Sequence, residues 1–234
     1  MTRLLLTYPD YVLQLALLLH DPIYHSNRTR SGASQPILLI PGFLVGDWTL
    51  WVMAGWLLRL GYTPYLSGID WNVRTPERTG ELLVRRLVYI VEATGRPVTI
   101  VGHSLGGLLA RFLGAACPEL VRHVVAVGSP LHDSPQAVHP FLHHAFRVLQ
   151  RLRKAGGRIQ SHWPTFVATA SSPLPTGIGS TAIFSTQDEI VDWRACVDPQ
   201  GDNYQVRGRH LGLVVNREVY RLLADILGLL PRMP

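Results

Sequence analysis

Short apolar runs and longer stretches of helical periodicity alternate along most of this chain. The apolar runs are typical of strands buried on both faces, and they occupy residues 36–40, 63–69, 97–101, 123–127, 180–185 and 203–207. Between them, helical patterns predict helices over residues 48–60, 75–94 and 105–116. This alternation favours an α/β fold class, with a sheet of about six mainly parallel strands, right-handed crossovers and flanking helices.

A distinct N-terminal region precedes the alternating part. Residues 10–19 are leucine-rich and predict a helix, and the polar stretch 27–35 indicates a linker. We therefore divide the chain into residues 1–34, an N-terminal helix and linker, and residues 35–234, an α/β domain. The helix either packs on the domain, or binds a membrane surface or a second copy of itself. Pro9 and Asp10 interrupt its apolar stretch, which argues against a secretory signal.

Residues 131–179 form a long insertion between the strands at 123–127 and 180–185, and we expect them to act as a cap or lid. Within it, residues 136–154 predict an amphipathic helix with a basic edge, either a lid facing substrate or membrane or an ordinary surface helix. Residues 163–175 are proline-rich and predict an irregular pocket wall rather than a helix. The insertion also carries His139, His143 and His144, but no local carboxylate or cysteine completes a metal site, so we expect no metal.

The stretch Gly102-His103-Ser104-Leu105-Gly106 lies where an apolar run gives way to a helical pattern. A serine at such a strand-to-helix turn has its hydroxyl exposed beside the first amides of the helix. The glycines around it suit a turn without room for larger side chains. Ser104 is therefore the candidate nucleophile, the N–H of Leu105 is a candidate oxyanion donor, and His103 is expected to line the turn.

A serine nucleophile needs a base and an acid that orients the base. Asp188 follows the run 180–185, and His210 follows the run 203–207, so both are expected at the carboxyl edge of the sheet with Ser104. Glu189 and Asp192 compete with Asp188 for the acid role. We expect Glu189 to point away and Asp192 to cap or support the loop, with Asp192 as the alternative acid. Asp188 itself could instead cap a helix that begins near residue 190.

From about residue 35 to the last helix, the sequence resembles α/β-hydrolases of the compact bacterial lipase and esterase type. The segments that carry the resemblance are 39–43, the turn at Ser104, 128–130, 188–191 and 208–212. The resemblance implies an α/β-hydrolase fold and a triad in the chain order Ser104, Asp188, His210. It also implies that the backbone N–H of Phe43, together with that of Leu105, forms the oxyanion hole. No cofactor is implied.

Composition narrows the partners and the compartment. Hydrophobic residues make up 47% of the 234 residues and charged residues only 16%, which suits an enzyme of lipid-like substrates. The formal net charge is +6, but no basic run alternates with aromatics, so we expect no nucleic-acid partner. Cys117 and Cys196 are expected to be free thiols in a reducing compartment. We therefore expect a cytoplasmic protein, with peripheral membrane contact through the N-terminal helix or the lid left open.

Three functional hypotheses follow. The first is a serine hydrolase that cleaves small carboxylic esters with an apolar part through an acyl-enzyme. The second keeps the same triad but transfers the acyl group or cleaves a thioester, as an acyltransferase or thioesterase. The third is a non-catalytic binding module built on a hydrolase fold, which the presence of all three candidate triad residues disfavours.

Overall fold

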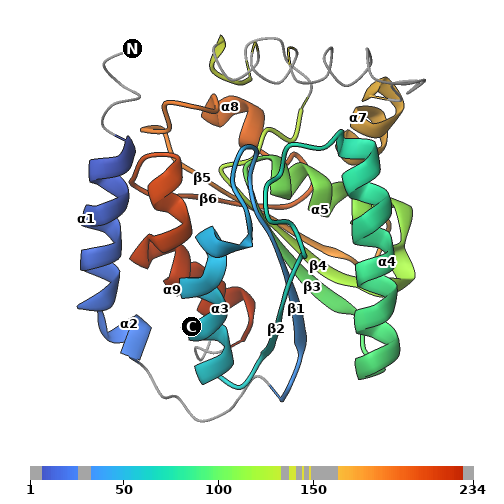
Figure 1. Cartoon of the computed structure of the whole chain (residues 1–234), viewed down its shortest axis with the longest axis horizontal. Coiled ribbons are helices and arrows are strands. Elements are labelled where there is room, and N and C mark those ends of the chain that lie inside the picture. The colour runs from blue at the N-terminus through green and yellow to red at the C-terminus, as the bar shows by residue number, and fades with distance from the viewer. Residues whose placement is uncertain are drawn as a thin grey trace.

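The computed structural model describes residues 7–25, 33–132, 137–140, 144, 148 and 163–228. Its centre is a six-stranded sheet in the order β2-β1-β3-β4-β5-β6, with every neighbouring pair parallel (Figure 1). The strands are β1 (Pro36–Ile40), β2 (Thr63–Leu66), β3 (Val98–His103), β4 (Val121–Val127), β5 (Gly179–Phe184) and β6 (Asp202–Gln205). The predicted class and strand number are thus confirmed, with β2 ending three residues earlier than expected.

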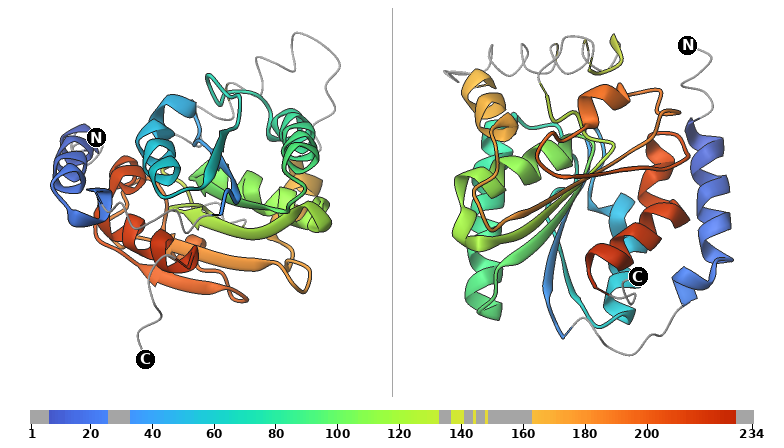
Figure 2. Two further views of the ribbon diagram at one scale, coloured as in Figure 1. Left: turned by 90° about the horizontal axis from the view of Figure 1, so that it is seen from below. Right: turned by 180° about the vertical axis from the view of Figure 1, so that it is seen from behind.

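Helices cover both faces of the sheet (Figure 2). Those described are α1 (Thr7–Leu19), α2 (Pro22–His25), α3 (Trp51–Arg59), α4 (Pro76–Thr94), α5 (Leu105–Ala116), α7 (Trp163–Ser171), α8 (Trp193–Cys196) and α9 (Arg217–Ile226). Short 3-10 helices are η2 (Asp47–Leu50), η3 (Pro118–Leu120) and η4 (Leu211–Val215). Figure 1 shows α1, α3 and α9 on one side of the sheet and α4, α5 and α7 on the other.

The strands divide their side chains between two apolar clusters, one on each face. In β1, Ile37 and Leu39 join the cluster of α3 and α9, whereas Leu38 and Ile40 join that of α4, α5 and α7. All four are fully buried, which explains why β1 is a continuous apolar run instead of an alternating one. Leu18 of α1 is also fully buried in the first cluster, so the N-terminal helix shares the core of the sheet domain.

Capping residues set the helix boundaries where the sequence predicted them. Helix α4 begins after Thr75, whose hydroxyl accepts a hydrogen bond from Arg78 N, and it ends at Gly95 in the left-handed conformation.

The expectation of an irregular segment over 163–175 was wrong, because residues 163–171 form α7. Pro164 lies in the first turn of that helix, where a missing N–H costs no hydrogen bond, so the proline does not prevent the helix.

Part of the insertion lies beside the loop that follows β5. Val138 forms an antiparallel bridge with Val191, His139 N donates to Ile190 O at 2.6 Å, and Asp192 N donates to Ala137 O at 2.9 Å. Most of the expected helix 136–154 falls outside the described residues, so its role as a lid stays a prediction. Among the helices that the structure describes, none combines the length and apolar character needed to cross a membrane.

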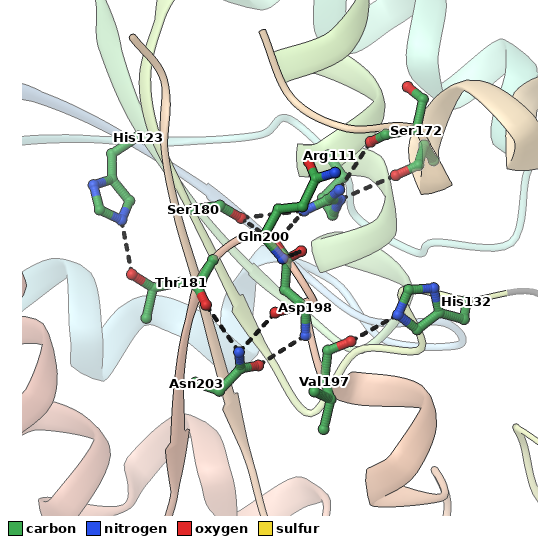
Figure 3. A network of polar contacts seen from close by, with 12 residues as sticks. Arg111, His123, His132, Ser172, Ser180, Thr181, Val197, Asp198, Gln200 and Asn203 are labelled. Atoms are coloured by element: carbon green, nitrogen blue, oxygen red, sulfur yellow. Dashed lines mark hydrogen bonds and ion pairs between the residues drawn. The ribbon is translucent and has the colours of Figure 1, made fainter. Parts of the chain in front are cut away.

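A buried ion pair ties α5 to the start of β5 (Figure 3). Arg111 of α5 pairs with Asp198, and both also bond to Ser180 at the start of β5. The guanidinium donates as well to the carbonyls of Ala170 and Ser172, at 3.1 and 2.9 Å. Burial raises the pKa of Asp198, but hydrogen bonds from Ser180 and Gln200 and the charge of Arg111 outweigh it and hold that pKa below its usual value.

Candidate active site

At one point in the sheet, the order in which the chain adds strands reverses its direction. From β1 the chain goes outward to β2 and then returns to β3 on the other side of β1. Loops after β1 and β3 therefore diverge, and ligands of open α/β sheets bind in the crevice at such a point. The expected oxyanion loop follows β1 and Ser104 follows β3, while Asp188 and His210 follow β5 and β6. All the predicted site residues thus lie beyond the carboxyl ends of the strands.

Ser104 occupies a strained turn between β3 and α5. Its φ and ψ are 55° and −123°, a left-handed conformation that is costly for a residue with a side chain. Ser104 N donates to Val127 O at 2.9 Å, which fixes the turn against β4. A Cβ on Gly102 would lie 2.2 Å from Gly106 O, and one on Gly106 would lie 2.2 Å from Ile40 O. The glycines are therefore required by close backbone contacts, and the serine stays partly exposed at the start of α5.

Asp188 and His210 are in direct contact. The distance from His210 Nδ1 to Asp188 Oδ2 is 2.7 Å, and both side chains are almost completely buried, at 4% and 1% exposed. The other carboxylate oxygen, Asp188 Oδ1, accepts hydrogen bonds from the N–H groups of Ile190 and Val191, each at 2.8 Å. Those bonds fix the carboxylate without a helix beginning at residue 190. Asp188 therefore orients the imidazole and leaves Nε2 for other chemistry.

The two competing carboxylates have other partners. Asp192 is the N-cap of α8 and accepts from Arg194 N at 3.0 Å, as the capping interpretation predicted. The expectation that Glu189 points away was wrong. Its carboxylate is 2% exposed and accepts from the backbone N–H of His210 at 3.3 Å, because the loop after β6 passes over it with an otherwise unpaired amide. Neither carboxylate bonds the imidazole of His210.

His103 connects the serine turn to the histidine loop. Its ring is buried, lies 4.7 Å from the ring of His210 by centroids, and places Nε2 3.0 Å from His210 O. Burial, above all, and the neighbouring charge of His210 lower the pKa of His103 to about 3. His103 is therefore neutral near pH 7, and its Nε2–H donates to the carbonyl of His210. This contact brings the residue next to Ser104 to within bonding distance of the candidate base.

The loop after β1 lies against the serine turn. A Cβ on Gly42 would lie 3.0 Å from Ser104 Cβ and 3.3 Å from His103 Nδ1, so the loop approaches the candidate nucleophile closely. Phe43 follows it and is partly buried. Asn72, which sequence reasoning missed, holds this loop through three hydrogen bonds: Nδ2 to Pro41 O, N to Val45 O, and O from Leu44 N. A lone asparagine in a loop gives no signal of that role in the sequence.

Within the described residues no three metal-binding side chains converge. Cys196 is buried near Asp188. Neither Cys196 nor Cys117 forms a disulfide. Burial, with smaller contributions from the charges of Asp188 and Asp192, raises the pKa of the Cys196 thiol, so it stays protonated.

Comparison with known proteins agrees with this arrangement. The family model of the alpha/beta hydrolase fold matches residues 66–162. Triacylglycerol lipases from Pseudarthrobacter phenanthrenivorans and Burkholderia plantarii are each 39% identical to this chain over 74 residues, which are 31% of it. That match spans only 23% and 20% of the two lipases' own lengths.

The likeness to solved structures extends further along the chain. A lipase from Bacillus licheniformis superposes with a TM-score of 0.63 over 85% of this chain and 94% of its own, at 16% sequence identity. At that identity the superposition is informative about the fold. Together with the sheet order, the family match and the serine turn, it shows that this chain has the α/β-hydrolase fold, in a form similar to bacterial lipases and esterases.

Proposed function

We propose that this protein is a serine hydrolase that cleaves carboxylic esters with an apolar part through an acyl-enzyme. The observation that carries the proposal is the buried His210–Asp188 pair at 2.7 Å, on the same sheet edge as a serine in a strained turn. A structural serine gains nothing from a left-handed backbone conformation that costs about 1–3 kcal/mol. A nucleophile does, because the turn exposes its hydroxyl beside the start of α5.

In the first half of the reaction, Ser104 Oγ attacks the ester carbonyl carbon while His210 Nε2 takes the hydroxyl proton. The carbonyl oxygen becomes an oxyanion, which accepts hydrogen bonds from the N–H groups of Leu105 and Phe43. Asp188 stabilises the imidazolium through Nδ1. When the intermediate collapses, the C–O bond to the alcohol breaks, His210 returns the proton to the leaving alkoxide, and the acyl group remains on Ser104.

In the second half, a water molecule attacks the acyl carbon and His210 Nε2 takes one of its protons. The new tetrahedral intermediate uses the same two N–H groups. Collapse breaks the bond to Ser104 Oγ, which recovers its proton from His210, and the carboxylic acid leaves. Each turnover therefore consumes one ester and one water and releases one alcohol and one acid.

The surroundings support an apolar substrate. Phe43 and Leu44 follow Gly42 in the loop that contacts the serine turn. Trp71, beside the loop-holding Asn72, is 61% exposed, and its ring contacts that of Trp48, which is 48% exposed, at 6.4 Å between centroids. The matched relatives are named as triacylglycerol lipases, which act on esters of fatty acids with glycerol. These features favour an ester with an apolar acyl or alcohol group.

The decisive experiment compares the wild type with Ser104→Ala on p-nitrophenyl esters of increasing chain length and with a fluorophosphonate probe. We expect Ser104→Ala to lose ester turnover and labelling while keeping the unfolding temperature. Ser172→Ala is a suitable control, because that hydroxyl bonds Thr169 O at the end of α7, away from the proposed centre. Undiminished turnover in Ser104→Ala would overturn the mechanism.

Product analysis separates the alternative functions. With an alcohol or amine added as a competing acceptor, a hydrolase releases mainly free acid, whereas an acyltransferase accumulates the transfer product. A thioester substrate in the same assay identifies a thioesterase. Folded wild-type protein that neither turns over esters nor labels with any serine probe would favour a binding module.

A further inference from the structure

The loop that carries His210 has its backbone held by side chains. Neighbouring strands bond each other through main-chain groups, but residues 207–210 follow β6 and leave the sheet. Their polar backbone groups still need partners, since an unpaired buried amide or carbonyl is costly. The side chains that bond them come from several elements: Glu218, Asn216, Gln187, Ser185, Asp10, Glu189 and His103.

One of these side chains comes from the N-terminal helix. Asp10 of α1 accepts a hydrogen bond from Arg209 N, with Oδ2 3.0 Å away, directly before the candidate base. The next amide, His210 N, donates to Glu189 Oε2, which comes from the loop after β5. Two consecutive N–H groups are therefore bound by carboxylates of two different elements. Asp10 thus holds the peptide plane between Gly208 and Arg209, and Glu189 holds the plane between Arg209 and His210. Fixing both planes restricts the backbone of Arg209, and with it the direction in which the His210 side chain leaves the loop.

Two more contacts bring α1 to the same loop. Gln14 Oε1 accepts from Asn216 Nδ2 at 3.0 Å, and that same Nδ2 donates to Arg207 O at 2.6 Å. On the other side of His210, a Cβ on Gly212 would lie 2.4 Å from Asp10 Oδ2. The glycine thus leaves the space that the Asp10 carboxylate occupies. Figure 1 shows α1 running along the side of the domain formed by α9.

We propose that α1 is a positioning element for the base of the reaction, with Asp10 as its principal positioning residue. This inference rests on the proposed function, because it assigns His210 its catalytic role. Asp10 does not touch the substrate or the imidazole. It acts through the backbone of residue 209, and keeps the Nδ1–Asp188 bond in the geometry that directs Nε2 toward the serine turn.

The test uses the full chain with three substitutions at the contact. Asp10→Ala removes the acceptor. Gly212→Ala keeps the Asp10 side chain in the sequence but adds a methyl group in the space that its carboxylate occupies, so the carboxylate must move. Both should lower kcat for a p-nitrophenyl ester by about tenfold or more with little change in KM, because the base is misaligned and substrate binding is not. Asp10→Asn keeps an oxygen acceptor for Arg209 N and should restore kcat to within a few-fold of the wild type.

A stability control separates positioning from general loosening of the fold. Leu87→Ala empties part of the apolar cluster on the opposite face of the sheet, so it should lower the unfolding temperature and leave kcat at 25 °C within twofold. A second readout is independent of turnover: the downfield proton resonance of the His210 Nδ1–H bonded to Asp188, which Asp10→Ala and Gly212→Ala should shift or broaden.

Wild-type kcat and an unchanged resonance in Asp10→Ala would overturn the inference. So would losses of kcat that follow the unfolding temperature alike in Leu87→Ala and Asp10→Ala, or an Asp10→Asn variant as slow as Asp10→Ala. Failure of the proposed function is distinguishable, because it is seen as full turnover in Ser104→Ala whatever the resonance does.

Discussion

Asp188 bonds His210 Nδ1 through one carboxylate oxygen, at 2.7 Å, and two backbone N–H groups through the other. The backbone of the loop after β5 therefore holds Asp188 Oδ1, and this orients Oδ2 toward the imidazole of His210. Only the imidazole tautomer with a proton on Nδ1 satisfies this oxygen. In that neutral tautomer, the lone pair of His210 Nε2 is the one that can accept a proton.

Asp188→Asn should lower kcat by about 10⁴-fold, because an amide nitrogen facing Nδ1 favours the wrong tautomer. Steady-state kinetics on a p-nitrophenyl ester measures the effect, with Asp192→Asn as the matched control. Asp192 caps the four-residue helix α8, so its substitution should leave kcat within a few-fold of the wild type. The reverse ranking of the two variants would assign the acid role to Asp192.

Gly42→Ala should impair catalysis without unfolding the protein. The added Cβ would lie 3.0 Å from Ser104 Cβ and 3.3 Å from His103 Nδ1, so the loop after β1 must move away from the nucleophile. We expect kcat/KM to fall by about tenfold or more, as donors to the oxyanion are displaced. In Gly55→Ala, by contrast, the added Cβ within α3 would meet only the flexible Arg59 side chain, at an ordinary contact distance of 3.9 Å, and chemical denaturation should show a gain in the free energy of unfolding of about 0.5–1 kcal/mol. Equal activity in the two variants would contradict the close approach.

His103 should make folding stability depend on pH. Its pKa is lowered from 6.5 to about 3 in the folded protein, so the unfolded chain binds a proton that the folded one does not between those values. The stabilisation is fully present above about pH 6.5 and is lost as the pH falls toward 3. His103→Asn lacks this group and keeps a donor for His210 O. We therefore expect the free energy of unfolding, measured with urea between pH 7 and 5, to rise less steeply with pH in His103→Asn than in the wild type. The two slopes should differ by about 1.4 kcal/mol per pH unit at most. Identical slopes would argue against a buried neutral His103.

The Arg111–Asp198 pair should matter for stability and not for catalysis. Asp198→Asn leaves the buried guanidinium without its counterion and should lower the free energy of unfolding by about 3–5 kcal/mol. The double variant Arg111→Met/Asp198→Leu should recover most of that loss. Ser180, which bonds Asp198, lies at the start of β5, whereas Asp188 follows the end of that strand, so kcat of the folded variants should be close to the wild type. A large fall in kcat would show coupling between the two ends of the sheet.

The elements that the sequence predicted well share one property: local residue patterns decide them. A strand buried on both faces, such as Pro36–Ile40, needs no partner to be recognised, and Thr75 and Gly95 mark the ends of α4 by their own chemistry. The serine turn is partly local: a Cβ on Gly102 would meet Gly106 O four residues on, whereas Gly106 is required by the distant backbone of Ile40. Asp188 and His210 were predicted from their place after strands, and the sheet then brings them together.

The features that escaped prediction depend on contacts between distant residues. Glu189 bonds the amide of His210 because β5 and β6 are adjacent, and Asn72 holds the loop after β1 because β2 pairs with β1. Neither relation has a trace in the neighbouring sequence. Helix α7 was missed for a different reason: the proline content of residues 163–175 was taken to indicate an irregular segment, although the first turn of a helix tolerates proline.

The bond between Asp10 and Arg209 joins residues 199 positions apart, so it closes a very long loop of the chain. Contacts of such long range form late in folding, after the entropy of bringing remote segments together has been overcome. On a ribosome, the serine turn and the acid can take shape while the last part of the chain is still being made. The histidine cannot be held in its final orientation until synthesis has passed it. The proposed base can therefore reach its final orientation only after the loop at residue 209 has joined α1.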